Sequence, residues 1–68
     1  MERQEVESSN IVSVGFEKGV LEVEFKGGSI YIYRGISNEV YNEFMEADSK
    51  GGFLARRIRG KFKCEKAG

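Results

Sequence analysis

The sequence predicts a small α+β domain in which a three-stranded antiparallel meander is followed by two short helices packed on one face of the sheet. Apolar residues alternate with polar or small ones through the first half of the chain, which is the period of a half-buried strand. After residue 36 they recur at helical spacings, and a Gly-Gly pair divides this region into two segments. The 68 residues suffice for one domain, which we place at 8–64, with flexible termini at 1–7 and 65–68.

The first predicted hairpin joins residues 11–16 to residues 20–25 through a turn at Glu17-Lys18-Gly19. Both segments alternate, so every second side chain lies on the same face of the sheet. The residues expected to face the core are Val12, Val14, Phe16, Leu21, Val23 and Phe25.

The third predicted strand, residues 30–34, is β-branched and aromatic throughout, so its pattern does not show which face is buried. A two-residue turn at Gly27-Gly28 would direct both isoleucines inward. A three-residue loop with a bulge would instead direct Tyr31 and Tyr33 inward, because a slip of one residue exchanges the two faces.

Two helices are expected after the sheet. The first has about ten residues and begins at Ser37 or Asn38, either of which can cap its first turn. The Ser49-Lys50-Gly51-Gly52 segment ends it, and the second runs from about Gly52 to Arg59. The helical residues expected in the core are Val40, Tyr41, Phe44, Met45, Ala47, Phe53, Leu54 and Ile58, with Phe62 as a final anchor.

Four short patches, taken together and in this order, resemble one family. They are Ser8-Ser9-Asn10-Ile11, Tyr31-Ile32-Tyr33, Ser49-Lys50-Gly51, and Ile58-Arg59 with Phe62 behind it. The family is the KTSC domain, a small module named for its place at the C-terminus of some lysyl-tRNA synthetases and also found as a free-standing protein. RNA binding is the usual suggestion for its role, so the resemblance implies RNA as a partner.

The resemblance also bears on the register of the third strand. The family's Tyr-x-Tyr motif usually tolerates a polar middle residue, as an exposed position would, so the resemblance favours Tyr31 and Tyr33 facing inward. This sequence departs from the family's usual pattern at two places: relatives commonly have proline where this chain has Ser37, and asparagine where this chain has Leu54-Ala55. The first alters the start of the helix, and the second removes a polar contact.

Charge is segregated along the chain. Residues 1–48 carry four basic and ten acidic side chains, a net charge of −6, whereas residues 49–68 carry seven basic and one acidic, a net charge of +6. Clustered basic residues are typical of a phosphate-binding surface, although they can equally pair with the protein's own acidic half. The predicted nucleic-acid contacts are Lys50, Arg56, Arg57, Arg59 and Lys61, of which the resemblance covers Lys50 and Arg59.

Two further motifs each have a functional and a structural interpretation. Ser49, Gly51 and Gly52 form a candidate anion cradle, because glycines that open a helix leave N–H groups uncovered; in the simpler interpretation Ser49 caps the second helix. Tyr31 and Tyr33 are either platforms on which bases stack or core aromatics with satisfied hydroxyl groups. We favour the structural interpretation of both.

Catalysis is not expected. The chain has no histidine and one cysteine, Cys64, so it can assemble neither a Ser-His-Asp or Cys-His triad nor a His/Cys zinc site. Glu22 and Glu24 share a strand face, but alternating glutamates on such a face are usually only solvated. We expect no cofactor, metal or small-molecule substrate. The polar N-terminus, the lone cysteine and the lack of a long apolar run predict a cytoplasmic protein without a membrane segment.

These observations predict a non-enzymatic binding module whose second helix and basic tail contact RNA phosphates. The alternative is a protein-interaction or homo-oligomerisation domain, in which an open sheet edge or the isoleucine face pairs with another copy and the basic helix docks on an acidic surface. A continuous basic face would favour RNA, and intermixed salt bridges would favour the alternative.

Overall fold

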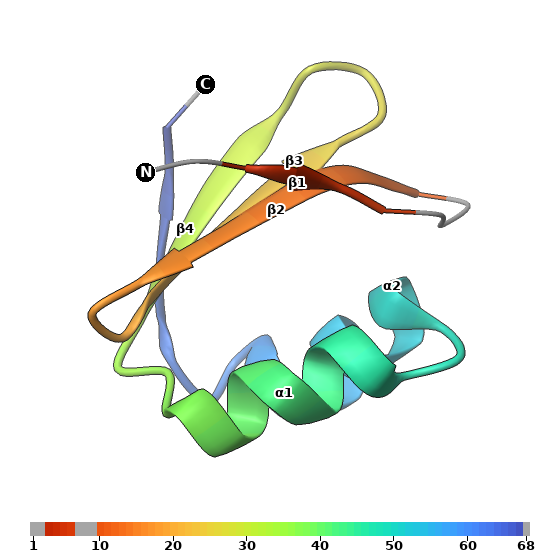
Figure 1. Cartoon of the computed structure of the whole chain (residues 1–68). Helices are drawn as coiled ribbons and strands as arrows, with labels where there is room; N and C mark the ends of the chain where they lie inside the picture. The colour runs from red at the N-terminus through yellow and green to blue at the C-terminus, as the bar shows by residue number, and fades with distance from the viewer. Residues whose placement is uncertain (1–2, 7–9, 68) are drawn as a thin grey trace.

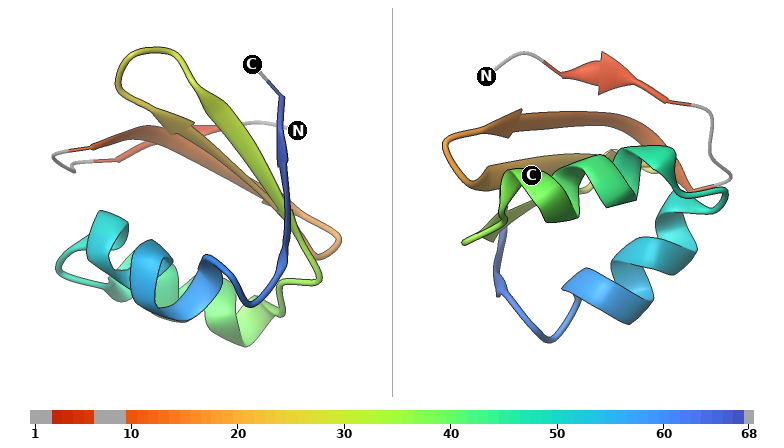
Figure 2. Two further views of the ribbon diagram at one scale, coloured as in Figure 1. Left: turned by 180° about the vertical axis from the view of Figure 1, so that it is seen from behind. Right: turned by 60° about the horizontal axis from the view of Figure 1, so that its bottom comes forward.

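The computed structural model of the chain describes residues 3–6 and 10–67. A five-stranded antiparallel sheet in the order β1-β2-β3-β4-β5 has its helices on one face (Figures 1 and 2). The strands are β1 (Gln4–Glu5), β2 (Ile11–Glu17), β3 (Val20–Phe25), β4 (Ile30–Arg34) and β5 (Lys63–Lys66). The helices are α1 (Asn38–Glu46) and α2 (Lys50–Phe53), which continues as a π-helical segment η1 (Leu54–Ile58). The predicted α+β class with an antiparallel sheet is confirmed.

The sheet has two more strands than the sequence predicts, so the three-strand prediction was wrong. β1 pairs with β2 through Gln4 and Glu5, and β5 pairs with β4 from Lys63 to Lys66. Every residue of both strands is exposed. No apolar alternation therefore marks them in the sequence, and only their backbone pairing makes them strands. β1 lies wholly, and β5 for two of its four residues, within segments for which the sequence predicts flexible termini.

The β2–β3 hairpin closes through Lys18 and Gly19, which both have positive φ (50° and 77°), as a type I′ turn requires. A bulge between Ile11 and Ser13 shifts the register at the start of β2. Ile11 is therefore buried, whereas Val12 is 37% exposed, contrary to the prediction that Val12 faces the core. One extra residue in the strand inverts the alternation before it.

The β3–β4 hairpin has the three-residue loop. The Phe25 N–H donates to the Ser29 carbonyl at 2.8 Å, which leaves residues 26–28 as the loop. In this register Tyr33 lies opposite Leu21 and Tyr31 opposite Val23, both of which are buried. The prediction that the two tyrosines face inward is confirmed.

Serine side chains cap both helices. The Val40 N–H donates to the Ser37 Oγ, and the Gly52 N–H donates to the Ser49 Oγ, each at 3.1 Å. The second helix begins at Lys50, two residues before the predicted start. Its π-helical end is marked by the Arg59 N–H, which donates to the Leu54 carbonyl at 2.8 Å.

The core lies between the sheet and the helices. Of the residues predicted to face it, Phe25 is half-buried, and those that are completely or almost completely buried include Leu21, Val23, Phe44, Leu54 and Ile58. Phe25 is the last residue of β3, and its ring meets Tyr31 edge to face with centroids 5.5 Å apart. The buried apolar residues are Ile11, Val14, Leu21, Val23, Tyr33, Ile36, Phe44, Phe53, Leu54 and Ile58. None of the helices in the described part of the chain has the length and apolarity that a bilayer crossing requires.

Candidate functional site

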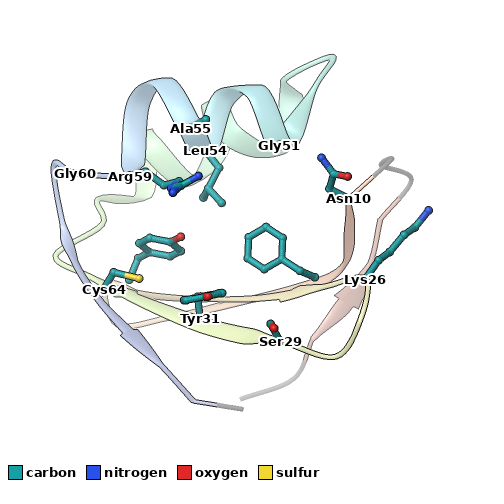
Figure 3. Close-up of a pocket in the computed structure, with 12 residues that line it drawn as sticks. Asn10, Lys26, Ser29, Tyr31, Gly51, Leu54, Ala55, Arg59, Gly60 and Cys64 are labelled. Carbon is teal, nitrogen blue, oxygen red and sulfur yellow. The ribbon is translucent and has the colours of Figure 1, made fainter.

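A cleft of about 620 Å³ lies between the inner face of the sheet and the α2–η1 helix (Figure 3). Its size falls within the range of about 300–1,000 Å³ that is usual for ligand pockets. The sheet contributes Phe25, Tyr31 and Tyr33 as the floor. The helix and the residues that follow it contribute Gly51, Leu54, Ala55, Arg59 and Gly60 as the roof. The cleft therefore lies between two layers, the sheet and the α2–η1 helix, and the core holds these layers in place.

The floor is aromatic because the β3–β4 register turns both tyrosines toward the helices. Tyr33 is 3% exposed, whereas Phe25 and Tyr31 are half-buried and keep part of their rings uncovered. The edge-to-face contact between Phe25 and Tyr31 fixes the two rings against each other. Planar apolar surface is thus available to a ligand in the cleft.

The charge of the cleft is positive. Arg59 and Lys26 line it, and no aspartate or glutamate is among its lining residues. Neither cation belongs to an ion pair within the described residues. Figure 3 shows the Arg59 side chain beneath the helix, and Lys26 at the opposite end of the cleft. The two ends of the cleft therefore each offer a cation to an anionic ligand.

Tyr33 supplies a neutral hydroxyl group to this site. Burial raises the pKa of Tyr33 to about 12, the neighbouring Cys64 thiol adds to the rise, and the positive charge of Arg59 opposes it. Cys64 lies opposite Tyr33 in the β4–β5 ladder. Near neutral pH the Tyr33 hydroxyl keeps its proton, as it would at its ordinary pKa of 10.0, and a hydrogen bond with the Cys64 side chain contributes to the rise.

The five predicted nucleic-acid contacts do not share one face. Arg59 lines the cleft, whereas Arg57 lies on the α1 side, where its Nη2 is 3.5 Å from Glu43 Oε1. The Arg57 guanidinium also lies 5.3 Å from the centroid of the Phe53 ring. The remaining three are Arg56 and Lys61, both exposed, and Lys50, which is half-buried at the start of α2.

In the predicted anion cradle, Ser49 has the capping role of the simpler interpretation. Its hydroxyl accepts from the Gly52 N–H, so that donor is engaged within the chain. A Cβ on Gly52 would lie 3.0 Å from Ser49 Oγ and 3.2 Å from Arg56 Nη1, so a side chain there would crowd the cap. Gly51 faces the cleft, where a Cβ would meet only Asn10 Nδ2, at 3.6 Å.

The two glutamates that share the outer face of β3 have different partners. Glu22 Oε1 lies 3.3 Å from Arg3 Nε, and Glu24 Oε1 accepts a hydrogen bond of 2.9 Å from Ser13 Oγ. Over the described residues, no group of three or more histidine, cysteine or acidic side chains is placed to hold a metal ion.

Sequence reasoning missed several residues of the cleft. Lys26 and Ser29 come from the connection between β3 and β4, Ala55 from the helix and Cys64 from the last strand, so no local spacing connects these three segments. Asn10 could have been identified as a candidate from the sequence, because it belongs to the first patch of the family resemblance. Ser8 and Ser9 of the same patch lie outside the described residues.

Comparisons with known proteins agree with this resemblance. The chain matches the KTSC domain family over residues 7–62. It is 42% identical over 53 residues to an uncharacterized protein of Stutzerimonas stutzeri strain A1501, with 75% of each chain covered. It is 32% identical over 63 residues to a protein of Tsukamurella paurometabola, with 90% of this chain and 94% of the relative covered.

The fold agrees as well. The crystal structure of a KTSC domain protein from Yersinia pestis superposes with a TM-score of 0.89 at 41% identity and covers 98% of this chain and 97% of that one. With the family matched over most of its length, the chain belongs to the KTSC domain family.

Proposed function

We propose that this domain is a non-enzymatic module that binds single-stranded RNA through the cleft and the basic residues around it. The observation that carries the proposal is a cleft with an aromatic floor, a cation at each end and no carboxylate among its lining residues. Proteins that bind single strands combine these two elements, because aromatic rings stack on bases and cations attract the phosphates.

The pattern of ion pairs supports the proposal. Of the seven cations in residues 49–68, Arg57 alone forms a salt bridge within the described part of the chain. Apart from this Arg57–Glu43 pair, the acidic half therefore does not neutralise the basic segment by salt bridges among the described residues, which leaves Arg56, Arg59 and Lys61 available to phosphate oxygens. Binding through such contacts releases counterions and weakens as salt is added.

The test is the salt dependence of binding to a fluorescein-labelled oligouridylate, followed by fluorescence anisotropy. On a single strand, log K falls with log salt by about 0.7 for each phosphate that is neutralised. Replacing Arg56 and Arg59 together by glutamine should lower the steepness of that slope by about 1.4, because two contacts are lost.

The control is Arg57→Gln, which removes one positive charge at the position between Arg56 and Arg59. Because Arg57 already pairs with Glu43 and covers the Phe53 ring, this variant should leave the slope almost unchanged. The proposal fails if the wild type does not bind at low salt, or if the Arg56/Arg59 variant and the wild type have the same slope.

A protein partner or a second copy of the chain is the other candidate. The observation that favours it is the pair Ile30 and Ile32, which lie on the outer face of β4 and are only half-buried. Light scattering on the pure protein distinguishes the two: a stable dimer that Ile32→Lys dissociates, together with no RNA binding, would establish the interaction module instead.

A further inference from the structure

We infer that the cleft is a nucleotide site, which takes one unstacked base of the RNA together with the phosphates on either side of it. This inference rests on the proposed function and deepens it. It states that the cleft binds a single nucleotide, whereas the proposed function requires only that the cleft and the cations around it attract RNA.

The floor of the cleft suits a base. Phe25 and Tyr31 are held edge to face at 5.5 Å and are half-buried, so each ring keeps a surface that a planar ligand can cover. A base that stacks there would bury apolar surface that now faces water. Because every base has a π face, such a floor does not require one particular sequence.

The two ends of the cleft suit the phosphates. Arg59 lies at the end formed by the helix and β5, and its planar guanidinium can bind two phosphate oxygens at once. Lys26 stands at the other end, in the β3–β4 loop (Figure 3). A strand that crosses the cleft would therefore meet one cation before the base and one after it.

The polar groups of the lining suit the edge of a base. Between the two cations, Ser29 and Tyr33 bring hydroxyl groups beside the aromatic rings of the floor. A few polar groups of this kind fix the orientation of a ligand in a mainly apolar pocket. The Tyr33 hydroxyl can donate to a ring nitrogen or a carbonyl oxygen of the base, because it keeps its proton.

The structure offers a variant that fills the cleft without touching its charges. Ala55 is exposed and lines the roof, so Ala55→Leu places a larger apolar side chain in the space proposed for the base. The matched control is Asn42→Leu, which adds a leucine at an exposed position of α1 that does not line the cleft. Gly51→Leu is a second filling variant, because Gly51 has no positive φ and its Cβ would contact only Asn10.

The experiment compares two probes of equal charge: an oligouridylate and an abasic ribose-phosphate oligomer of the same length. The wild type and Asn42→Leu should bind the uridine oligomer about 5- to 150-fold more tightly, which is the worth of about one stacked base. In Ala55→Leu this preference should disappear, while the salt slope stays that of the wild type. If Ala55→Leu does not fold, as judged by its thermal melt, Gly51→Leu takes its place.

Two outcomes overturn the inference and leave the proposed function standing. In the first, the wild type binds both oligomers equally tightly. In the second, the folded filling variant keeps the preference for bases.

If the wild type binds no RNA, the proposed function fails, and uridine 5′-monophosphate then tests the cleft alone by NMR titration. Amide shifts at Tyr31 and Arg59 that vanish in Ala55→Leu would support a nucleotide site. Their absence at millimolar nucleotide would overturn it.

Discussion

Replacing Phe44 by alanine probes how strongly one ring holds the sheet and the helices together. Phe44 is 0% exposed, and its ring centroid lies 6.0 Å from that of Phe53. Because the side chain is completely buried, the substitution loses its full transfer free energy and leaves a cavity, at a cost of about 3–5 kcal/mol. A domain of 68 residues has a stability of about 3–10 kcal/mol, at about 0.05–0.15 kcal/mol per residue. The variant should therefore lose about a third of its stability or more.

The assay is urea unfolding followed by circular dichroism, in which the midpoint should fall sharply while the slope m stays close to that of the wild type. Phe62→Ala is the matched control, because Phe62 packs against the core but is only half-buried. It should cost less, since its ring keeps part of its surface in water in the folded state. A midpoint for Phe44→Ala at or above that of Phe62→Ala would refute the assignment of the core.

The two tyrosines give the remaining predictions. Tyr31→Phe should change the free energy of unfolding by no more than about 1–2 kcal/mol, and Tyr31→Ala should cost less than Tyr33→Ala, because only Tyr33 is buried; thermal melts of equal midpoint for the two alanine variants would contradict this. The folded pKa of Tyr33, about 12, lies above its ordinary value of 10.0, so the neutral hydroxyl stabilises the fold below about pH 10 and this stabilisation is lost as the pH rises to about 12. Relative to Tyr33→Phe, the free energy of unfolding of the wild type should fall by about 2–3 kcal/mol over this interval, as measured by urea unfolding at each pH. Parallel curves of unfolding free energy against pH for the two proteins would show that the hydroxyl is not buried in this way.

The strands that could be predicted are those with one face in the core. β2 and β3 show the alternation that burial imposes, β4 is marked by its β-branched and aromatic residues, and Ser37 and Ser49 mark the helix starts by their capping chemistry. β1 and β5 have no buried face, so nothing in their side chains distinguishes them from a loop. The position of Val12 could not be predicted either, because a bulge is set by the pairing of two strands rather than by the composition of one.

The sequence identifies individual residues of the candidate site, but it does not show that they lie together in space. Arg59, Tyr31 and Tyr33 are functional candidates on the sequence alone, yet nothing in their spacing shows that the guanidinium lies above the tyrosines. That juxtaposition depends on the three-residue β3–β4 loop, which turns the tyrosines inward, and on the helix that carries Arg59 over them. Lys26 and Cys64 join the site only through the completed sheet.

The last strand has a consequence for solubility. β4 contains the run Ile30-Tyr31-Ile32-Tyr33, whose β-branched and aromatic composition is typical of segments that aggregate when their backbone is unpaired. β5 pairs with Tyr31, Ile32 and Tyr33, and the Ala67 N–H that follows it donates to the Ile30 carbonyl at 2.7 Å. β5 also brings Lys63 and Lys66 to the edge, where charged side chains oppose the addition of further strands. The family match ends at residue 62, one residue before β5 begins. A chain shortened to that match would keep its core but expose the β4 edge, and we expect it to precipitate where the longer chain stays in solution.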